Sequence, residues 1–337
     1  MKAYESLMSD RLADGQVGAI RRVVAPARLH FALFNESGAN GRVDGGAGVA
    51  VASPRWDITL SKVVGVPARR DAPPPVSRIV GKLCEYYGYP ACQVKIARAI
   101  PSHVGLGSHT ALAMAIARGY CALHGIDDDY INWARAVRRG GTSGVGVHVS
   151  QYGGFVVDGG REFPAEKSSF GPSSLELADP PALVARGETP PSLRMIHFRL
   201  GRRGLSGKDE AKFFRESTPV PTMETYEILR LVETYLIPGI EQQDIGLIDE
   251  ILSELQGLGL KRLEWEIQDR ATQDLRDVWS DVRRRNPRLP SLCLSSMGPT
   301  TFMLTDAPEE TVRILRGLGI RRFMVTGAVR GARVSHV

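Results

Sequence analysis

The sequence has few cysteines and no long apolar run, and these two shortages exclude several classes of protein. Its four cysteines, Cys84, Cys92, Cys121 and Cys293, form no C-x-x-C pair and have no histidines at a spacing that holds zinc. We therefore expect reduced thiols and no zinc centre. No stretch approaches the roughly 20 apolar residues of a membrane span, and the N-terminus has no apolar signal core. The prediction is a soluble, cytoplasmic protein that enters no membrane.

The sequence also has no concentrated block of one charge sign. Its net charge is +6, but the 43 lysines and arginines are scattered over 337 residues. Hydrophobic residues make up 43% and charged residues 24%, which is ordinary for a folded protein long enough for two domains. A scattered positive excess favours phosphate-bearing small molecules as partners and argues against nucleic acid.

Residues 100–110, IPSHVGLGSHT, stand between a strand-like segment and the alanine-rich stretch ALAMAIA. The two glycines allow backbone N–H groups to turn toward a ligand, and Ser108 or Thr110 is the expected N-cap of the helix that follows. A helix start offers unpaired N–H groups and about half a positive charge, which predicts a bound phosphate or pyrophosphate. No Gly-Lys-Ser/Thr follows, so this is not a Walker motif. The predicted contacts are Ser102, His103, Gly105, Leu106, Gly107, Ser108, His109 and Thr110.

A second glycine-rich stretch, residues 138–148 (RRGGTSGVGVH), also has the composition of an anion site. Arg139, the backbone of residues 140–144 and the hydroxyls of Thr142 and Ser143 are the expected donors, with Gly140, Gly141 and Gly144 shaping the loop. The alternatives are a tight structural turn for the first loop and a flexible connection for the second. Glycine spacing alone leaves these alternatives open.

Apolar and polar residues alternate over residues 28–33, which predicts a strand with Leu29, Phe31 and Leu33 on one face. Arg28 and His30 then share the other face. A glycine-rich turn at residues 41–46 adds Arg42 and Asp44, so we interpret these four polar residues as facing a ligand. Two further loops have site-like composition, GLSGK at 204–208 and SSMGPT at 295–300, although each is equally well explained as a capped turn.

The order of expected elements divides the chain in three. Residues 1–18 are a weakly patterned arm, residues 19–185 a domain that contains the first loop, and residues 186–337 a second domain. Residues 161–192 are rich in proline, serine and glutamate and predict an irregular crossing. Without its additional helices, the second half reads strand-helix-strand-strand-helix-strand, which is a ferredoxin-like layout.

Six segments together resemble the β-ribofuranosylaminobenzene 5′-phosphate synthase family, which has the fold of the GHMP kinase superfamily. They are PARLH at 26–30, GRVDGG at 41–46, the loop at 101–110, RGGTSG at 139–144, GGFVVDGG at 153–160 and GLSG at 204–207. The resemblance favours anion sites over turns. It implies an α+β, GHMP-kinase-like fold with an N-terminal ribosomal-protein-S5-like domain and a C-terminal ferredoxin-like domain with extra helices.

The resemblance also implies an activity. The family joins 5-phosphoribosyl pyrophosphate (PRPP) to 4-aminobenzoate through carbon, with loss of pyrophosphate and CO2, on the way to methanopterin. Members that use other aromatic acids build C-nucleoside antibiotics of the formycin and pyrazofurin kind. The expected partners are thus PRPP, an aromatic carboxylic acid, Mg²⁺ and a second copy of the chain in a homodimer.

Site roles follow from the resemblance residue by residue. Residues 105–110 would hold pyrophosphate, and Arg139 with residues 140–144 the ribose 5-phosphate, although the two assignments are interchangeable. Arg28, His30 and Asp44 would be catalytic, with Asp44 on an amino group or the ribose hydroxyls. The acceptor would contact Arg42, Lys208, Ser295 and Ser296. Metal ligands are left unassigned.

Two positions depart from related patterns. Kinases of the superfamily have an aspartate in the place of Gly146 and a magnesium-binding serine in the place of His109, so this chain lacks groups that phosphoryl transfer needs. His109 also departs from the methanopterin members, and the arginine-rich composition resembles that of actinobacterial proteins. On these grounds we predict 4-amino-pyrazole-3,5-dicarboxylate as the acceptor. The alternatives are the 4-aminobenzoate synthase, a small-molecule kinase that uses ATP, and a non-catalytic nucleotide-binding regulator.

Overall fold

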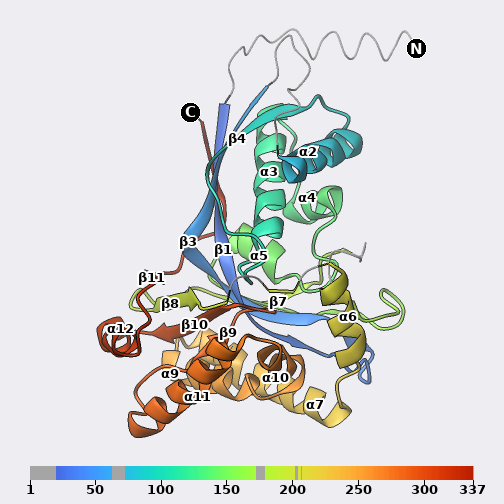
Figure 1. The fold of residues 1–337 in the computed structure, drawn as a ribbon. Helices are drawn as coiled ribbons and strands as arrows, with labels where there is room; N and C mark the ends of the chain where they lie inside the picture. Colours follow the sequence, from blue (N-terminus) through green and yellow to red (C-terminus); the bar gives the residue numbers. More distant parts are fainter. Residues whose placement is uncertain (1–19, 63–72, 172–178, 202–203, 206, 337) are drawn as a thin grey trace, which may run out of the picture.

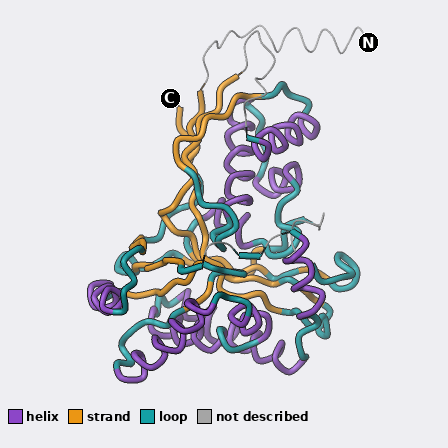
Figure 2. The backbone as a smooth tube through the Cα atoms, viewed as in Figure 1, coloured by secondary structure: helices purple, strands orange, loops and turns teal. Residues whose placement is uncertain are grey.

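The structure is a computed structural model that describes residues 20–62, 73–171, 179–201, 204–205 and 207–336. The predicted arm at residues 1–18 lies outside these ranges. Two large β-sheets, each accompanied by helices, organise the described residues, and a third sheet has two strands (Figures 1 and 2).

The first sheet is built on two long antiparallel strands, β1 (Ile20–Phe34) and β3 (Gly45–Lys62). Its strand order is β12-β1-β3-β5-β7, and β4 also pairs with β3. The other strands are β4 (Cys92–Arg98), β5 (Phe155–Asp158), β7 (Leu183–Gly187) and β12 (Arg333–His336). Because β12 pairs with β1, the chain returns at its end to the sheet where it began. β7 falls within the stretch expected to be irregular, so that expectation was wrong for residues 183–187.

Four helices accompany this sheet: α2 (Pro74–Tyr87), α3 (Ser108–His124), α4 (Tyr130–Val137) and α5 (Val145–Tyr152). α3 packs against both β1 and β3, and its alanine-rich sequence is buried on nearly every side. The predicted cap of α3 was wrong. The N-cap of α3 is Gly107 rather than Ser108 or Thr110, because the Ser108 hydroxyl donates instead to the Ile100 carbonyl, 2.9 Å away. The N-cap of α4 is Asp129.

The second sheet has the order β11-β8-β10-β9, all neighbours antiparallel, which confirms the ferredoxin-like layout. Its strands are β8 (Arg194–Arg199), β9 (Cys293–Leu294), β10 (Thr300–Thr305) and β11 (Phe323–Thr326). The accompanying helices are α6 (Lys208–Ser217), α7 (Thr222–Leu231), a π-helical turn η1 (Val232–Leu236), α8 (Ile237–Glu241), α9 (Ile245–Leu255), α10 (Gly259–Glu266), α11 (Arg270–Arg285) and α12 (Pro308–Gly317). In Figure 1, α9, α10, α11 and α7 lie beneath this sheet.

The two sheets share one apolar core. Phe31 of β1 stacks on Phe302 of β10 with ring centroids 5.7 Å apart, and Phe31 also contacts Phe155 of β5. All three rings are fully buried. The lower end of β1 is therefore held between the sheets, and residues near Phe31 are placed rigidly.

A bulge in β1 changes which residues share a face. The pairing with β3 shifts between His30 and Ala32, and such bulges are frequent beside active sites. Because of this shift, Leu33 leaves the buried face of Leu29 and Phe31 and joins Arg28 and His30 on the wall of a cavity. Simple alternation predicted the first part of the strand correctly and Leu33 wrongly.

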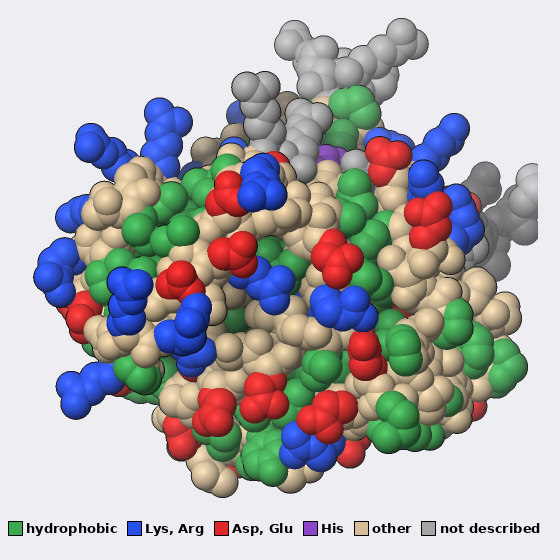
Figure 3. Space-filling view, turned by 60° about the horizontal axis from the view of Figure 1, so that its bottom comes forward, with side chains coloured by type: hydrophobic (Ala, Val, Ile, Leu, Met, Phe, Trp, Pro, Cys, Tyr) green, Lys and Arg blue, Asp and Glu red, His purple; other side chains and the backbone are tan. Residues whose placement is uncertain are grey.

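Charged side chains are mixed in sign on the face shown in Figure 3, where lysines and arginines lie among aspartates and glutamates. This agrees with the scattered charge of the sequence. None of the described helices is both long and apolar enough to cross a lipid bilayer.

Candidate active site

A cavity of about 370 Å³ lies where β1, the start of α3, the loop before α5, the loop after β9, α6 and α10 come together. Both predicted glycine-rich loops reach it. Residues 103–110 line one wall, and Arg139, Thr142, Ser143 and Gly146 line another. The two predicted anion sites are therefore two walls of one cavity rather than separate sites, and Ser102 lies outside it.

The first wall presents backbone N–H groups. The carbonyl of Gly105 accepts hydrogen bonds from Arg28 Nη1 at 2.6 Å and from Ser295 Oγ at 2.7 Å, and the carbonyl of Leu106 accepts from Arg28 N at 3.2 Å. In a trans peptide the N–H points away from the carbonyl of the same unit. Among the described residues, no acceptor binds the N–H groups of residues 106–110. These groups and the positive end of the 17-residue helix α3 form a ready anion site.

Gly107 is the residue that brings this wall close to Arg28. Its φ is +69°, and a Cβ built there would lie 2.8 Å from Cγ of Arg28. Burial lowers the pKa of Arg28 to about 10, so the guanidinium stays charged at neutral pH. A second arginine, Arg139, lies near His109, whose pKa is lowered by burial and then by the Arg139 charge. Two cations thus flank the N–H groups.

The second wall offers fewer free hydrogen-bond donors to a ligand than its sequence predicts. The Thr142 hydroxyl donates to the Gly171 carbonyl at 2.8 Å, and the Ser143 hydroxyl donates to Asp158 Oδ2 at 3.1 Å. Both hydroxyl protons are therefore used inside the protein, although both residues line the cavity, and their contact with phosphate stays a prediction. Gly140, Gly141 and Gly144 do not line the cavity. Arg139 keeps its predicted place on the cavity wall.

His30 is held in one protonation state by this wall. Its Nε2 lies 3.3 Å from Ser143 Oγ, and because that hydroxyl donates to Asp158, we assign the His30 proton to Nε2. Burial, followed by the charges of Arg28 and Lys261, holds the pKa of His30 well below its usual value, so the ring is neutral. Asp158 itself is buried and accepts from the N–H groups of Gly46, Gly144 and Gly160.

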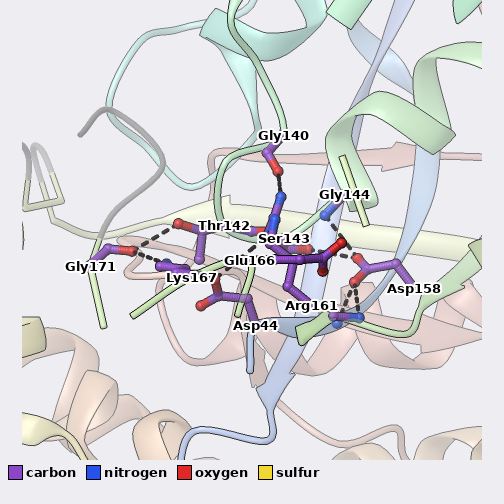
Figure 4. Close-up of polar contacts among 12 residues, drawn as sticks. Asp44, Gly140, Thr142, Ser143, Gly144, Asp158, Arg161, Glu166, Lys167 and Gly171 are labelled. Atoms are coloured by element: carbon purple, nitrogen blue, oxygen red, sulfur yellow. Dashed lines mark hydrogen bonds and ion pairs between the residues drawn. The ribbon is translucent and has the colours of Figure 1, made fainter. Parts of the chain in front are cut away.

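Asp44 and Arg161 form a buried ionic network behind the cavity (Figure 4). Asp44 Oδ2 accepts from Lys167 Nζ at 2.6 Å and lies 3.5 Å from Arg161 Nη1, and all three side chains are at most 2% exposed. Arg161 also donates to the carbonyls of Gly140 and Thr142. This network fixes the second loop. Asp44 is enclosed and does not line the cavity, so the prediction that it touches substrate was wrong.

The predicted acceptor contacts divide in the same way. Arg42 donates to the carbonyls of Gly159 and Gly160, both at 2.8 Å, and lies away from the cavity. Lys208 is exposed at the start of α6 and is not among the lining residues, although Gly207 is. Ser295 is fully buried and joins His30 N to the Gly105 carbonyl. Ser296 lines the cavity as predicted.

Sequence reasoning missed the side of the cavity that α6 and α10 supply. Leu205, Phe214 and Met297 give it an apolar surface, and Glu210 and Glu264 add two carboxylates. Burial raises the pKa of Glu210, whose charge lies close enough to Arg139 and Arg28 to be stabilised by them. Leu205 and Met297 lie in the two loops whose composition is site-like, whereas Glu210, Phe214 and Glu264 stand in helices in which no local motif marks them.

Gly146 lies on the cavity wall opposite Thr110, and a Cβ at this position would be 3.1 Å from the Thr110 methyl group. An aspartate here would project into the cavity beside the N–H groups. The chain has only a hydrogen atom at the point where the related kinases have their aspartate.

Comparison with known proteins bears out the fold. A model of the GHMP kinases N terminal domain matches residues 75–154. Among solved structures, a mevalonate diphosphate decarboxylase from Enterococcus faecalis superposes with a TM-score of 0.66 at 11% identity, and a homoserine kinase from Cytophaga hutchinsonii with 0.59 at 18%. Both alignments cover 95% of this chain and 99% of the other. At such low identities they establish the fold alone.

Two relatives of higher identity are each described as a beta-ribofuranosylphenol 5′-phosphate synthase. The protein of Archaeoglobus fulgidus is 32% identical over 291 residues, which are 85% of this chain and 88% of that protein. The protein of Methanothermobacter thermautotrophicus is 32% identical over 322 residues, 90% of this chain and 94% of its own length.

The buried network predicts the effect of Asp44→Asn. Removing the charge leaves Lys167 and Arg161 without their shared carboxylate in a buried site, which should lower the free energy of unfolding by about 3 kcal/mol or more. Urea unfolding measures this. The folded fraction should bind anions as tightly as the wild type does. Weaker anion binding at an unchanged free energy of unfolding would show instead that Asp44 contacts the ligand.

The close approach of Gly107 to Arg28 predicts the effect of Gly107→Ala. The left-handed conformation costs about 1–2 kcal/mol, and the new methyl group pushes Arg28 from the anion wall, so pyrophosphate affinity should fall about tenfold or more. Gly125→Ala is a matched control, because Gly125 ends the same helix at φ +67° with nothing within 4 Å of its Cβ position. Equal pyrophosphate affinity in the two variants, measured by calorimetry, would contradict the geometry.

Proposed function

The chain belongs to the family of beta-ribofuranosylphenol 5′-phosphate synthases, and we propose that it forms a C-riboside by decarboxylative C-glycosylation of an aromatic acid. In this reaction the ring carbon that carries the carboxylate bonds to the anomeric carbon of PRPP. The bond from the anomeric carbon to pyrophosphate breaks, and the ring then loses CO2. The observation that carries the proposal is the wall of unpaired N–H groups at residues 106–110 beside an apolar surface in the same cavity.

The acceptor that we propose is a single-ring benzoate with a hydroxyl or amino group. The names of the relatives specify a ribofuranosylphenol as the product. If this phenol ring forms with loss of CO2, the acid that supplies it is a hydroxybenzoate. This replaces the pyrazole dicarboxylate that His109 and the composition predicted. The relatives lend no support to that acceptor or to a role in antibiotic synthesis.

The anion wall suits a leaving group that gains charge. As the anomeric carbon becomes oxocarbenium-like, negative charge grows on pyrophosphate, and fixed N–H donors stabilise it without rearranging. Arg28 and Arg139 add positive charge on either side. Residues 106–110 therefore take the pyrophosphate in this proposal, and Arg139 the ribose 5-phosphate.

Mg²⁺ would fit beside Glu210, whose charge interacts with those of Arg139 and Arg28 at the anion wall. No group of three or more metal-binding side chains occurs in the described part of the chain, but Mg²⁺ usually takes one or two carboxylates together with substrate phosphates. Glu210, which lines the cavity, would be such a carboxylate. The ion would supply countercharge to the pyrophosphate.

Phosphoryl transfer is disfavoured by the position of Gly146. A kinase of this fold would need a carboxylate on the acceptor hydroxyl, and the wall has none at this point. A homodimer and a cytoplasmic location remain predictions, and sedimentation would check the first.

The reaction predicts a product ratio. Purified protein with PRPP, Mg²⁺ and 4-hydroxybenzoate or 4-aminobenzoate should release pyrophosphate and CO2 in equal amounts, and chelation of Mg²⁺ should stop both. A parallel incubation with 4-amino-pyrazole-3,5-dicarboxylate tests the acceptor replaced here. Release of neither product with all three acids, together with ADP formation from ATP and an alcohol, would sink the synthase proposal.

Arg28 lines the cavity with its buried, charged guanidinium, which predicts a contact with the acceptor carboxylate. Arg28→Ala should weaken binding of the benzoate about 10-fold to 100-fold, the usual range for a hydrogen bond to a charged group. Arg22→Ala on the same strand is the control, since Arg22 is half-exposed and pairs with Asp57. If calorimetry gives equal benzoate affinities for wild type and Arg28→Ala, the carboxylate is held elsewhere.

A further inference from the structure

The cavity has two chemically different ends. The end formed by residues 106–110 and Arg139 presents N–H groups and positive charge. The other end presents four apolar side chains, those of Leu33, Leu205, Phe214 and Met297, which belong to one apolar cluster. A charged sugar phosphate suits the first end, and the face of an aromatic ring suits the second.

Glu264 lines the cavity beside this apolar surface, and its charge also interacts with that of Arg28. Glu264 is 4% exposed and lies one turn after Leu260 on α10. The residue four positions further on, Gln268, hydrogen-bonds both the Glu264 carbonyl and the Met297 carbonyl, which ties this part of α10 to the Met297 loop. The carboxylate is therefore a neighbour of the apolar surface.

One oxygen of the carboxylate is used by the protein and the other is not. Oε2 of Glu264 accepts from Lys261 Nζ, and this ammonium is fixed by the carbonyls of Leu294 at 3.2 Å and Ser296 at 3.5 Å. Among the described residues, Oε1 has no hydrogen-bond partner. Lys261 provides the countercharge that a buried carboxylate needs, and it orients the group. A buried carboxylate with one oxygen that the protein does not bind calls for a donor on the ligand.

We infer that Glu264 is a catalytic residue that accepts a hydrogen bond from the ring hydroxyl or amino group of the acceptor. This inference rests on the proposed function and adds the substituent that the site selects. A ring that binds its carboxylate near Arg28 and its face on Phe214 and Met297 turns the substituent opposite the carboxylate toward Glu264.

The chemistry gives this contact a role beyond binding. When the ring carbon uses a π pair to bond to the anomeric carbon, pyrophosphate leaves with the pair of the broken C–O bond. Positive charge then spreads to the oxygen or nitrogen opposite the reacting carbon, and its N–H or O–H becomes a stronger donor to Glu264. The C–CO2 bond breaks, its pair restores the aromatic ring, and no proton is lost overall. The hydrogen bond is thus stronger in the transition state than in the bound substrate.

Ligand binding to the wild type gives a first test. 4-Hydroxybenzoate and 4-aminobenzoate should bind about 10-fold to 100-fold more tightly than 4-fluorobenzoate, which is similar in size but has no donor at that position. Isothermal titration in the absence of PRPP measures this preference. Equal affinities for the hydroxy and fluoro acids, or no binding of any of the three, would overturn the inference without use of a variant.

Glu264→Gln provides the second test. The amide keeps the shape and can still accept from Lys261, but it offers no free charged oxygen, so the preference for hydroxyl over fluorine should shrink to about threefold or less. The rate of pyrophosphate release with 4-hydroxybenzoate should fall about tenfold or more even at saturating acid, because the contact strengthens in the transition state. Glu266→Gln is the control, since Glu266 lies on the same helix with 59% of its side chain exposed. A variant Glu264→Gln that keeps the full preference would contradict the assignment.

The two proposals fail in different ways. Release of pyrophosphate and CO2 without any preference for a donor substituent leaves the synthase reaction standing and removes Glu264 from it. A strong preference in binding, lost in Glu264→Gln, together with no release of either product, supports Glu264 as the group that recognises the ring and refutes its catalytic role along with the proposed reaction.

Discussion

The site depends on how the carbonyl of Gly105 is held. Arg28 from β1 and Ser295 from the loop after β9 both donate to it, so three segments that are far apart in the sequence meet at one oxygen atom. Because the peptide is planar, holding this carbonyl on the β1 side turns the next N–H to the other side. The start of α3 then presents its N–H groups to the cavity rather than to the protein. The same Ser295 hydroxyl accepts from His30 N, so one side chain joins β1 beside its bulge to the anion wall.

Most of the fold is predictable from the sequence because local patterns determine it. The alternation in β1 and the alanine-rich α3 predict those elements, and the strand order of the second half predicts the ferredoxin-like sheet. The GHMP-kinase-like architecture was implied by the family resemblance. Local patterns fail where tertiary contacts decide. The bulge after His30 is set by pairing with β3, and it moves Leu33 to the cavity. The Ser108 hydroxyl prefers the Ile100 carbonyl to a capping role.

The part of the site that is formed by backbone N–H groups was predictable from the sequence. Glycines before a helix signal an anion wall, and Arg28 and His30 stand beside it. Side-chain roles were harder to predict, because a motif shows which residues recur together and not which way they point. Asp44 and Arg42 are in a segment of the family pattern, yet neither lines the cavity. They support the second loop and the pairing of β2 (Arg42–Val43) with β6 (Arg161–Glu162) instead. Glu264 and Phe214 reach the cavity only because α6 and α10 fold over it.

The polar groups near the reacting centre are unsuited to removing a proton, and the proposed reaction does not require one. His30 is neutral, and its Nε2 hydrogen is directed to Ser143. Asp158 is enclosed by four donors, and position 146 has no side chain. In an ordinary aromatic substitution a base removes a ring proton to restore aromaticity. In a decarboxylation the electron pair of the broken C–CO2 bond restores it, so no base is needed. What the enzyme must provide is charge at both ends of the transition state. In the proposed reaction, negative charge collects on pyrophosphate at the N–H wall, and positive charge collects on the ring substituent, which we infer to lie beside the buried carboxylate of Glu264.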